Sequence, residues 1–192
     1  MTRTTRWYPV HLIDVVHVAD GGRITIRPTL PQDVELQRAF FRALSAESRY
    51  GRFMTRLREL PDTLAERFAN IDYRHHLALL AEVFDEAGHE TMIGEARYVV
   101  DERDSTTCEL AIAVADEWQC RGIARALLER LERQAVASGI RRMIADTLIT
   151  NRAMHGLLSR AGFATSASRE DADVSRLEKV IAGATPGRPL AA

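Results

Sequence analysis

Residues 114–125, with the sequence VADEWQCRGIAR, place a glycine and two arginines where a strand gives way to the start of a helix. The first turn of a helix leaves about four backbone N–H groups unpaired and carries roughly half a positive charge, so it attracts anions. Gly122 has no Cβ to keep a ligand from the backbone, and Ala124 keeps the next turn shallow. Arg121 and Arg125 add guanidinium groups that suit phosphate oxygens. The stretch therefore predicts a pyrophosphate site.

The same loop lacks the features of two common nucleotide-binding motifs. It has neither the glycine-lysine-serine/threonine ending of the Walker A loop nor the three spaced glycines of the dinucleotide-binding fingerprint. This disfavours nucleotide hydrolysis and hydride transfer. An ordinary strand-to-helix turn with a glycine has similar residues, so the loop alone leaves that alternative open.

The first part of the chain is expected to form one hairpin and three helices. Residues 15–27 read VVHVADGGRITIR, in which two β-prone runs flank a turn signal at residues 20–22. Apolar side chains spaced for one helix face follow Asp33. Further helical segments are expected over about residues 45–53 and after Pro61.

The rest of the chain is expected to position the loop between strands. Three β-like runs are followed by a helix, a strand and a second helix, with the strands at residues 76–84, 92–100, 107–114 and 143–149 and the last helix at 151–160. The helix after the loop carries a regular apolar stripe and ends at Gly139. Residues 107–149 run strand, helix, strand, which implies a crossover and one parallel pair. We expect an α+β (mixed α/β) fold with one central sheet.

Length and composition argue for a single globular domain of 192 residues with short appendages. We expect an N-terminal extension over residues 1–23 that supplies the first strand of the hairpin, one domain over 24–182, and a flexible tail over 183–192. Basic residues number 26 and acidic residues 27, so no global field attracts nucleic acid or anionic lipid. We expect neither kind of partner.

Cysteine and histidine usage predicts no disulfide framework and no metal site. Cys108 and Cys120 are too few for either, and the adjacent His75 and His76 point to opposite faces of a strand. The apolar stretch at residues 10–19 is broken by polar residues, and no run reaches the roughly 18 apolar residues of a membrane span. We expect a soluble, cytoplasmic protein.

Two motifs and their order in the chain carry a family resemblance. Residues 119–124 read QCRGIA and follow a strand, while Asn151 opens the next helix and Gly162-Phe163 closes it. These segments resemble the Q-x-x-G-x-G/A loop and the asparagine to glycine-phenylalanine pattern of the GNAT superfamily of N-acetyltransferases, and the likeness extends over about residues 24–180. Residues 44–53 resemble the bacterial protein-lysine acetyltransferase branch.

This resemblance implies a GNAT-like fold, with a central mixed, mostly antiparallel sheet flanked by helices and a β-α-β-α core for acyl-CoA. Its fourth and fifth strands splay into a V that holds acetyl-CoA as co-substrate, with the pyrophosphate on the loop and the pantetheine arm on the backbone of residues 112–114. The residues that the resemblance assigns to this cofactor are Ile112, Ala113, Val114, Gln119, Cys120, Arg121, Gly122, Ile123, Ala124, Arg125 and Asn151.

The resemblance also makes Glu109 the general base. A lysine amine has a solution pKa of about 10.4, so it arrives protonated and needs a base before it attacks a thioester. Strand alternation places Glu109 on the opposite face from Cys108, Leu110, Ile112 and Val114. A solvated strand glutamate is the plain alternative.

Other family positions are less clear-cut. Many relatives carry a tyrosine as general acid where this sequence has Leu158. His155 is a candidate replacement for that acid, and a plain surface or packing role is the alternative. In relatives the segment with Arg49, Tyr50 and Arg52 lies at the acceptor entrance, although ordinary helix surface explains these residues equally well.

The predicted function is acetyl transfer from acetyl-CoA to a primary amine, in first place a protein lysine, by direct attack without a covalent enzyme intermediate. The leucine at position 158 and the N-terminal hairpin keep a second hypothesis open, a catalytically weak acyl-CoA-binding regulatory module. Small-molecule amines also stay open, because a fold does not fix the acceptor. The sequence does not indicate which acyl chain the enzyme prefers or what its oligomeric state is. A homodimer stays open.

Overall fold

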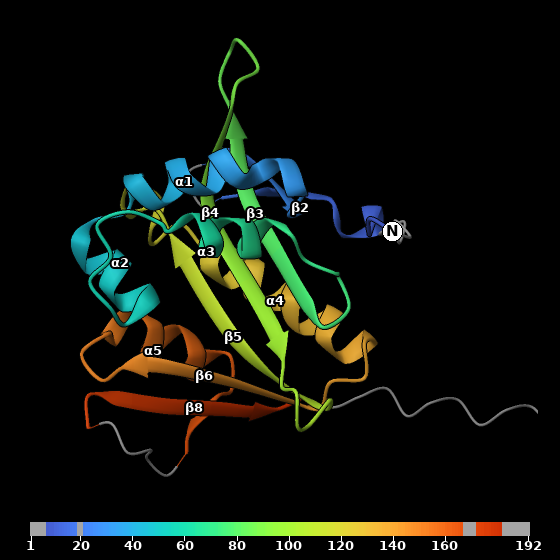
Figure 1. The fold of residues 1–192 in the computed structure, drawn as a ribbon, viewed down its shortest axis with the longest axis vertical. Helices are drawn as coiled ribbons and strands as arrows, with labels where there is room; N and C mark the ends of the chain where they lie inside the picture. The colour runs from blue at the N-terminus through green and yellow to red at the C-terminus, as the bar shows by residue number, and fades with distance from the viewer. Residues whose placement is uncertain (1–6, 19–20, 167–171, 182–192) are drawn as a thin grey trace, which may run out of the picture.

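The computed structural model describes residues 7–18, 21–166 and 172–181. Within them, eight strands form one sheet in the order β1-β2-β3-β4-β5-β6-β8-β7 (Figure 1). The strands are β1 (Asp14–His17), β2 (Arg23–Pro28), β3 (His76–Phe84), β4 (Glu90–Val100), β5 (Thr107–Val114), β6 (Arg142–Leu148), β7 (Ala164–Thr165) and β8 (Val174–Val180). Neighbouring strands are antiparallel except for β5 and β6. The predicted mixed, mostly antiparallel sheet is confirmed.

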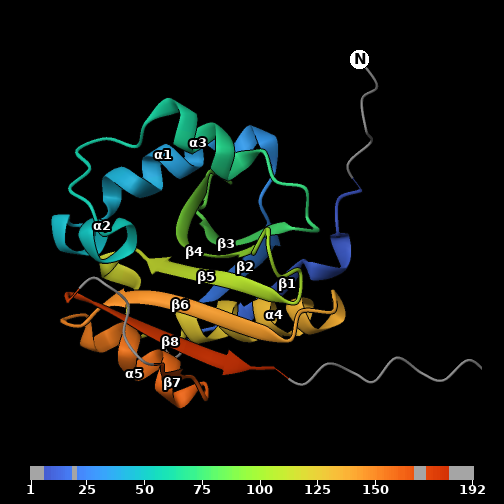
Figure 2. The ribbon, with the colours of Figure 1, turned by 60° about the horizontal axis from the view of Figure 1, so that its bottom comes forward.

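Helices cover both faces of this sheet (Figures 1 and 2). One face carries α1 (Val34–Ala43), α2 (Ala46–Phe53) and α3 (Asp62–Ala69), and the other carries α4 (Ile123–Ala137) and α5 (Arg152–Arg160). We call them the α1–α3 face and the α4–α5 face. Short 3-10 turns lie at Val10–Leu12, Pro31–Asp33 and Asp116–Trp118. None of the described helices is long and apolar enough to cross a bilayer.

The main core lies between the sheet and α4. The apolar stripe of α4 is buried there, with Ile123, Leu127 and Leu131 at most 1% exposed. It packs against the β5 side chains that point to the α4–α5 face, among them Cys108 and Leu110. Each fully buried side chain of this size contributes about 1.5–3 kcal/mol, so this contact fixes α4, and with it the loop that precedes α4, against β5.

Two strands at the C-terminal edge were not predicted. β8 pairs with β6 from Arg142↔Val180 to Leu148↔Val174, and the short β7 adds to its far side. The sequence of β8, VSRLEKV, buries only Leu177, so its apolar alternation is too weak to signal a strand. The hairpin of β1 and β2 is present, whereas residue 20 of its predicted turn and the predicted tail over 183–192 lie outside the described residues.

Strands β5 and β6 separate soon after they meet. They are paired only through Thr107↔Arg142, Cys108↔Met143 and Glu109↔Ile144. Beyond that point β5 follows β4, and β6 follows β8. Because each strand keeps its other neighbour, the twist of the sheet carries the two apart. The β6-facing backbone edge of residues 110–114 is left without a strand partner.

Candidate functional site

The gap between β5 and β6 forms a pocket of about 450 Å³ that is open to solvent. We call it the β5–β6 pocket. It is lined by α2, β5, β6 and α5 through Gly51, Arg52, Met54, Glu109, Leu110, Ala111, Ile112, Ala145, Asp146, Thr147, Met154 and Leu158. These residues come from both sides of the sheet, so the pocket joins the α4–α5 face to the α1–α3 face. Because β1 adds one strand at the N-terminus, β5 and β6 correspond to the fourth and fifth strands of the expected V.

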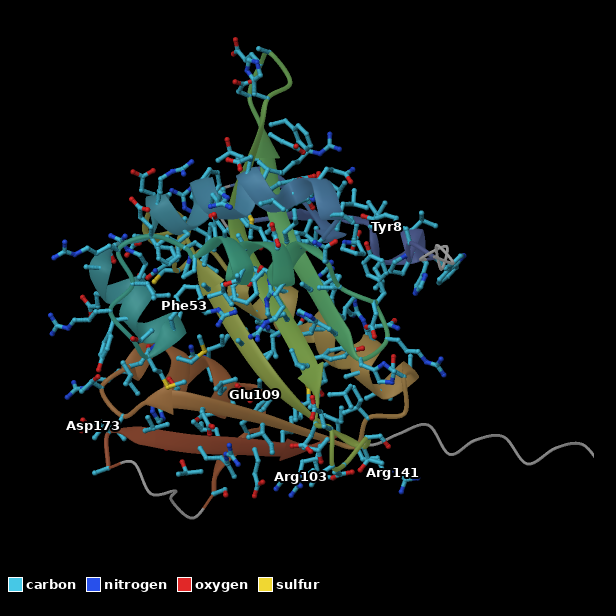
Figure 3. The ribbon with its side chains drawn as sticks, in the orientation of Figure 1. Tyr8, Phe53, Arg103, Glu109, Arg141 and Asp173 are labelled. Carbon is cyan, nitrogen blue, oxygen red and sulfur yellow. The ribbon has the colours of Figure 1, made fainter. Side chains whose placement is uncertain are left out.

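Glu109 lies in the last β5–β6 pair, where the strands begin to separate (Figure 3). Its side chain is exposed on the α1–α3 face, whereas Cys108 and Leu110 beside it are buried on the other face, as the alternation predicts. The next residue on its own face is Ala111, whose methyl group leaves room for a ligand. A carboxylate therefore stands at the mouth of the β5–β6 pocket.

The loop before α4 has the backbone of an anion site. The φ angle is 61° at Cys120 and 88° at Gly122, so both residues are left-handed. Apart from its chain neighbours, no described residue has an atom within 4 Å of where a Cβ on Gly122 would stand, so the backbone angle favours glycine while the space beside it is open. No described side chain caps the start of α4, and Ile123 packs its side chain into the core. The first N–H groups of α4 are thus available to a ligand.

The other predicted loop residues are placed as follows. Ala124 is partly buried against the core. The Arg121 guanidinium carbon lies 4.8 Å from the centroid of the Trp118 ring, and Arg125 Nε donates to Glu129 at 2.7 Å. The Arg125 side chain is exposed at the surface of the first turn of α4.

The side chains of Gln119 and Asn151 are engaged within the protein. Gln119 Nε2 donates to the Val114 carbonyl at 3.1 Å and lies 3.3 Å from Ser48 Oγ. Asn151 caps α5, because its Oδ1 accepts from the Met154 N–H at 3.1 Å. The backbone of residues 112–114 forms the open β5 edge, with the Val114 carbonyl already bonded.

Two further features escaped the sequence analysis. Asp116 accepts hydrogen bonds from the Ser45 N–H and from the Ser45 and Ser48 hydroxyls, all at 2.8 Å. Partial burial opposes ionisation, yet these bonds lower the pKa of Asp116 from its ordinary value. Thr147 lines the β5–β6 pocket and is 2% exposed, and its hydroxyl has no hydrogen-bond partner among the described residues. Neither feature has a local sequence signature.

The sequence matches a known protein family. The family model described as acetyltransferase (GNAT) family matches residues 38–163. The chain belongs to this family. Acetyltransferase PA5475 of Pseudomonas aeruginosa is 31% identical over 152 residues, which cover 79% of this chain and 81% of that protein. Acetyltransferase Pat of Mycolicibacterium smegmatis is 33% identical over 147 residues, 77% of this chain and 43% of Pat.

Solved GNAT structures share the fold. The GNAT domain of S. lividans PAT superposes with a TM-score of 0.83 at 31% identity, covering 91% of this chain and 99% of that one. The structure of yncA from Salmonella typhimurium with its cofactor acetyl-CoA gives 0.62 at 18% identity over 88% of this chain and 100% of that one. The predicted family, and its likeness to the Pat branch, are confirmed. The protein is an N-acetyltransferase that uses an acyl-CoA donor.

This acetyltransferase has no ionisable group at the position where many GNAT members carry a tyrosine. Leu158 is fully buried and lines the β5–β6 pocket. His155 Nε2 lies 3.2 Å from the Leu148 carbonyl, a packing contact with the end of β6. Neither residue offers a proton donor in the pocket.

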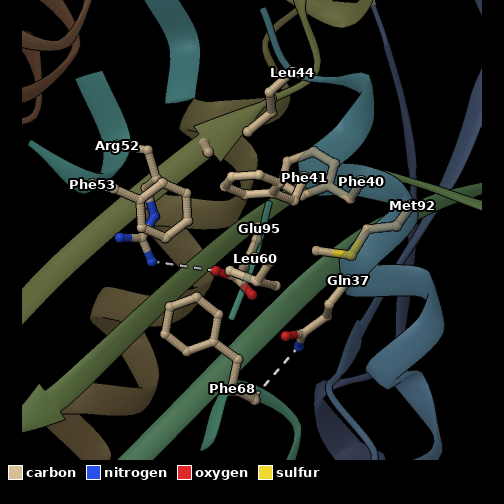
Figure 4. A pocket seen from close by; sticks show the side chains of 11 residues that line it. Gln37, Phe40, Phe41, Leu44, Arg52, Phe53, Leu60, Phe68, Met92 and Glu95 are labelled. Atoms are coloured by element: carbon tan, nitrogen blue, oxygen red, sulfur yellow. Dashed lines mark hydrogen bonds and ion pairs between the residues drawn. The ribbon is translucent and has the colours of Figure 1, made fainter. Parts of the chain in front are cut away.

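A buried charged cluster lies beside the pocket on the α1–α3 face (Figure 4). Glu95 and Arg97 of β4 are 5% and 3% exposed, and Arg97 bonds both oxygens of Glu95, with Nε to Oε1 at 2.9 Å. Arg52 of α2 reaches Glu95 at 3.4 Å. Burial opposes ionisation of Glu95, but the charges of both arginines lower its pKa. The alternation of Glu95 and Arg97 within the apolar part of β4 is a sequence signal for a buried charged pair, whereas the partners from α2 and β3 leave no local signature.

His76 closes the cluster at its other end. Arg97 Nη1 lies 3.0 Å from His76 Nε2, and because a guanidinium cannot accept a hydrogen bond, this nitrogen is the acceptor and the ring is neutral. Burial, and then the charge of Arg97, lowers the pKa of His76 from 6.5 to about 4.

We expect His76 to make the protein less stable as the pH falls from 6.5 to about 4. His76 gains its proton near pH 6.5 in the unfolded chain and only near pH 4 in the folded chain. Between these pH values the unfolded chain binds more protons, so the free energy of unfolding falls as the pH falls. The loss from this group is about 3 kcal/mol. His76→Gln keeps an acceptor for Arg97 and removes the loss, which urea unfolding at several pH values would show as a flatter profile.

His75→Gln is the matched control, because the His75 ring lies next door in sequence but is exposed. That variant should keep the wild-type slope. An equally steep loss of stability in His76→Gln and in the wild type would contradict the prediction.

Proposed function

We propose that this acetyltransferase moves an acetyl group from acetyl-CoA to the ε-amine of a protein lysine, with Glu109 as general base. One observation carries the proposal. Glu109 stands where β5 and β6 separate, and it lines a pocket that joins the two faces of the sheet. A carboxylate at that point meets an amine that arrives on the α1–α3 face.

The chain's own groups fit acetyl-CoA. The unpaired β5 edge at residues 112–114 suits the amides of a pantetheine arm, and the uncapped start of α4, with Arg121 and Arg125 beside it, suits a pyrophosphate. The unpartnered Thr147 hydroxyl in the pocket is a buried polar group that a ligand would satisfy. Asn151 uses only Oδ1 in the described hydrogen bonds and keeps its amide hydrogens for the cofactor.

A protein acceptor is supported by the shape of the α1–α3 face. No described helix lies in front of β6 and β8 in Figure 1, so no described helix blocks the approach of a polypeptide segment to the sheet beside Glu109. The hairpin strand β1 lies at the opposite edge of the sheet and does not cover the pocket. This open access favours an enzyme over a regulatory module that only binds acyl-CoA.

Acetyl-CoA supplies the thioester whose carbonyl carbon the acceptor nitrogen attacks, so that a C–N bond forms and the C–S bond breaks. Glu109 takes the proton that the ammonium group must lose before attack, directly or through a water molecule. The small side chain of Ala111 leaves the nitrogen room to approach. Because Leu158 has no ionisable proton to donate, a solvent water molecule protonates the departing CoA thiolate.

We expect Glu109→Gln to lower acceptor-dependent turnover by about 100-fold or more at pH 7, because a positioned base contributes about 10²–10⁴ in rate. The amide keeps the size of the side chain, so CoA affinity measured by calorimetry should not change. Turnover is measured as thiol release from acetyl-CoA with a dialysed protein lysate as acceptor, and mass spectrometry identifies the acetylated lysines.

Glu178→Gln is the control, because Glu178 lies in the same row of the same face, paired with Ile144 on the far side of β6. It should retain turnover within about twofold, because Glu178 is not among the residues that line the β5–β6 pocket. Unchanged thiol release in Glu109→Gln would refute the base assignment. Release without acetylated lysine in the lysate would refute the protein acceptor.

The loop assignment is tested by Gly122→Ala. A Cβ at φ 88° strains the backbone and occupies the open space beside the helix start, so we expect CoA to bind about tenfold more weakly in calorimetry. Gly139→Ala imposes similar strain at φ 84°, also with open space, at the other end of α4. The two variants should lose similar stability, but only Gly122→Ala should lose CoA affinity. Equal CoA affinity in both would contradict the assignment.

A further inference from the structure

Arg52 of α2 points toward Glu95 of the sheet (Figure 4), and it lines two cavities. With Glu109, it lines the β5–β6 pocket. With Glu95, it lines a smaller cavity under α1 and α3. Its side chain is 11% exposed, so its charge is held close to the pocket and away from bulk water.

The surroundings hold the Arg52 guanidinium in one place. Nη2 lies 3.4 Å from Glu95 Oε1. The guanidinium carbon lies 5.0 Å from the centroid of the Phe53 ring and 5.6 Å from that of Phe68. Aromatic faces attract a cation and exclude water from it. The charge of Arg52 is therefore both fixed and weakly screened.

The cluster around Arg52 carries a surplus of positive charge. It contains two guanidinium groups, Arg52 and Arg97, but one carboxylate, Glu95, and its His76 is neutral. Arg97 bonds both oxygens of Glu95, whereas Arg52 reaches one of them at 3.4 Å. Burial lowers the pKa of Arg52, and the carboxylates of Glu95 and Glu109 oppose that effect. The surplus charge therefore rests on Arg52 and acts on Glu109.

Among the described residues, the charged groups near Glu109 on other elements pair with one another. Arg176 of β8 makes a bidentate pair with Asp146 of β6, with N–O distances of 2.7 and 2.6 Å. Glu178 of β8 lies within 3.9 Å of Arg142 of β6. The charged groups that face Glu109 from the surrounding strands and helix are Arg52, Glu95, Arg97, Arg142, Asp146, Arg176 and Glu178.

We propose that Arg52 is a positioning residue. Its fixed positive charge makes the pair formed by Glu109 and the acceptor amine lose a proton at a lower pH. An ammonium group beside Glu109 experiences repulsion from Arg52, so the acceptor loses its proton at a lower pH than free lysine does. The inference rests on the proposed role of Glu109. It adds how an amine that is protonated in solution becomes reactive at neutral pH.

A purely structural role for Arg52, that of holding α2 to β4 through Glu95, predicts different results. Arg52→Gln keeps hydrogen-bonding groups but removes the charge, whereas Arg52→Lys keeps the charge. Our inference predicts that, in the wild-type background, Arg52→Gln moves the rising limb of the kcat–pH profile upward by about one unit, whereas Arg52→Lys leaves it nearly in place. A structural role predicts a loss of turnover that is the same at every pH.

A thiol placed at position 109 measures the electrostatic effect of the Arg52 charge without any acceptor amine. In a Cys120→Ser background, Glu109→Cys is alkylated by iodoacetamide at a rate set by its thiolate fraction. Cys108 does not compete, because burial raises its pKa to about 12. Adding Arg52→Gln should raise the pH at which the alkylation rate is half-maximal by about one unit. Below that pH, the alkylation rate should then be roughly tenfold lower. Adding Glu95→Gln, which increases the surplus positive charge, should move that pH in the opposite direction.

Arg49→Gln is the control, because Arg49 lies one turn earlier on α2, over the Phe41 ring, and hydrogen-bonds the Arg58 carbonyl. It should leave the midpoint unchanged. The inference would be overturned if Arg52→Gln left the pH of half-maximal alkylation unchanged. It would also be overturned if Glu95→Gln raised that pH. The thiol reporter needs neither Glu109 nor an acceptor, so failure of lysine acetylation would refute the proposed function and leave this measurement intact.

Discussion

Strands β5 and β6 share three residue pairs and then part, and the candidate site depends on that separation. Each strand keeps its pairing with its other neighbour, so the sheet stays continuous while the β6-facing edge of residues 110–114 loses its ladder. Unpaired backbone groups are costly when buried, so they must face a ligand, a side chain or water. Gln119 satisfies the Val114 carbonyl, and the rest of this edge becomes a binding surface beside Glu109.

Helix α2 spans this gap and links its two sides. At its start, Ser45 and Ser48 bond Asp116, just after β5. In its middle, a Cβ on Gly51 would stand 3.2 Å from the Asn151 amide nitrogen, after β6. A helix of eight residues is not stable alone, so these contacts set its position. One short helix thus contacts the cofactor loop and the start of α5 and carries the charge near Glu109.

How far the sequence predicts this arrangement depends on the range of the contacts involved. The start of α4 after the loop and the face of Glu109 follow from local rules of helix ends and strand alternation, and the pattern predicts both. The left-handed backbone at Gly122 was not predicted, although a glycine permits it. β8 was missed because a strand with one buried residue, lying between β6 and the short β7, is held mainly by backbone pairing. The Glu95 cluster was missed because its members come from β3, β4 and α2, and only folding brings them together.

The central claim is that the unpaired edge of β5 binds the co-substrate, and amide hydrogen exchange measured by NMR tests it most directly. The experiment compares the full chain with and without saturating CoA, residue by residue. The account predicts slower exchange in the presence of CoA at residues 110–114 and at the first turn of α4, with no change along the β1–β2 hairpin. Tight CoA binding that leaves exchange at residues 110–114 unchanged would contradict it.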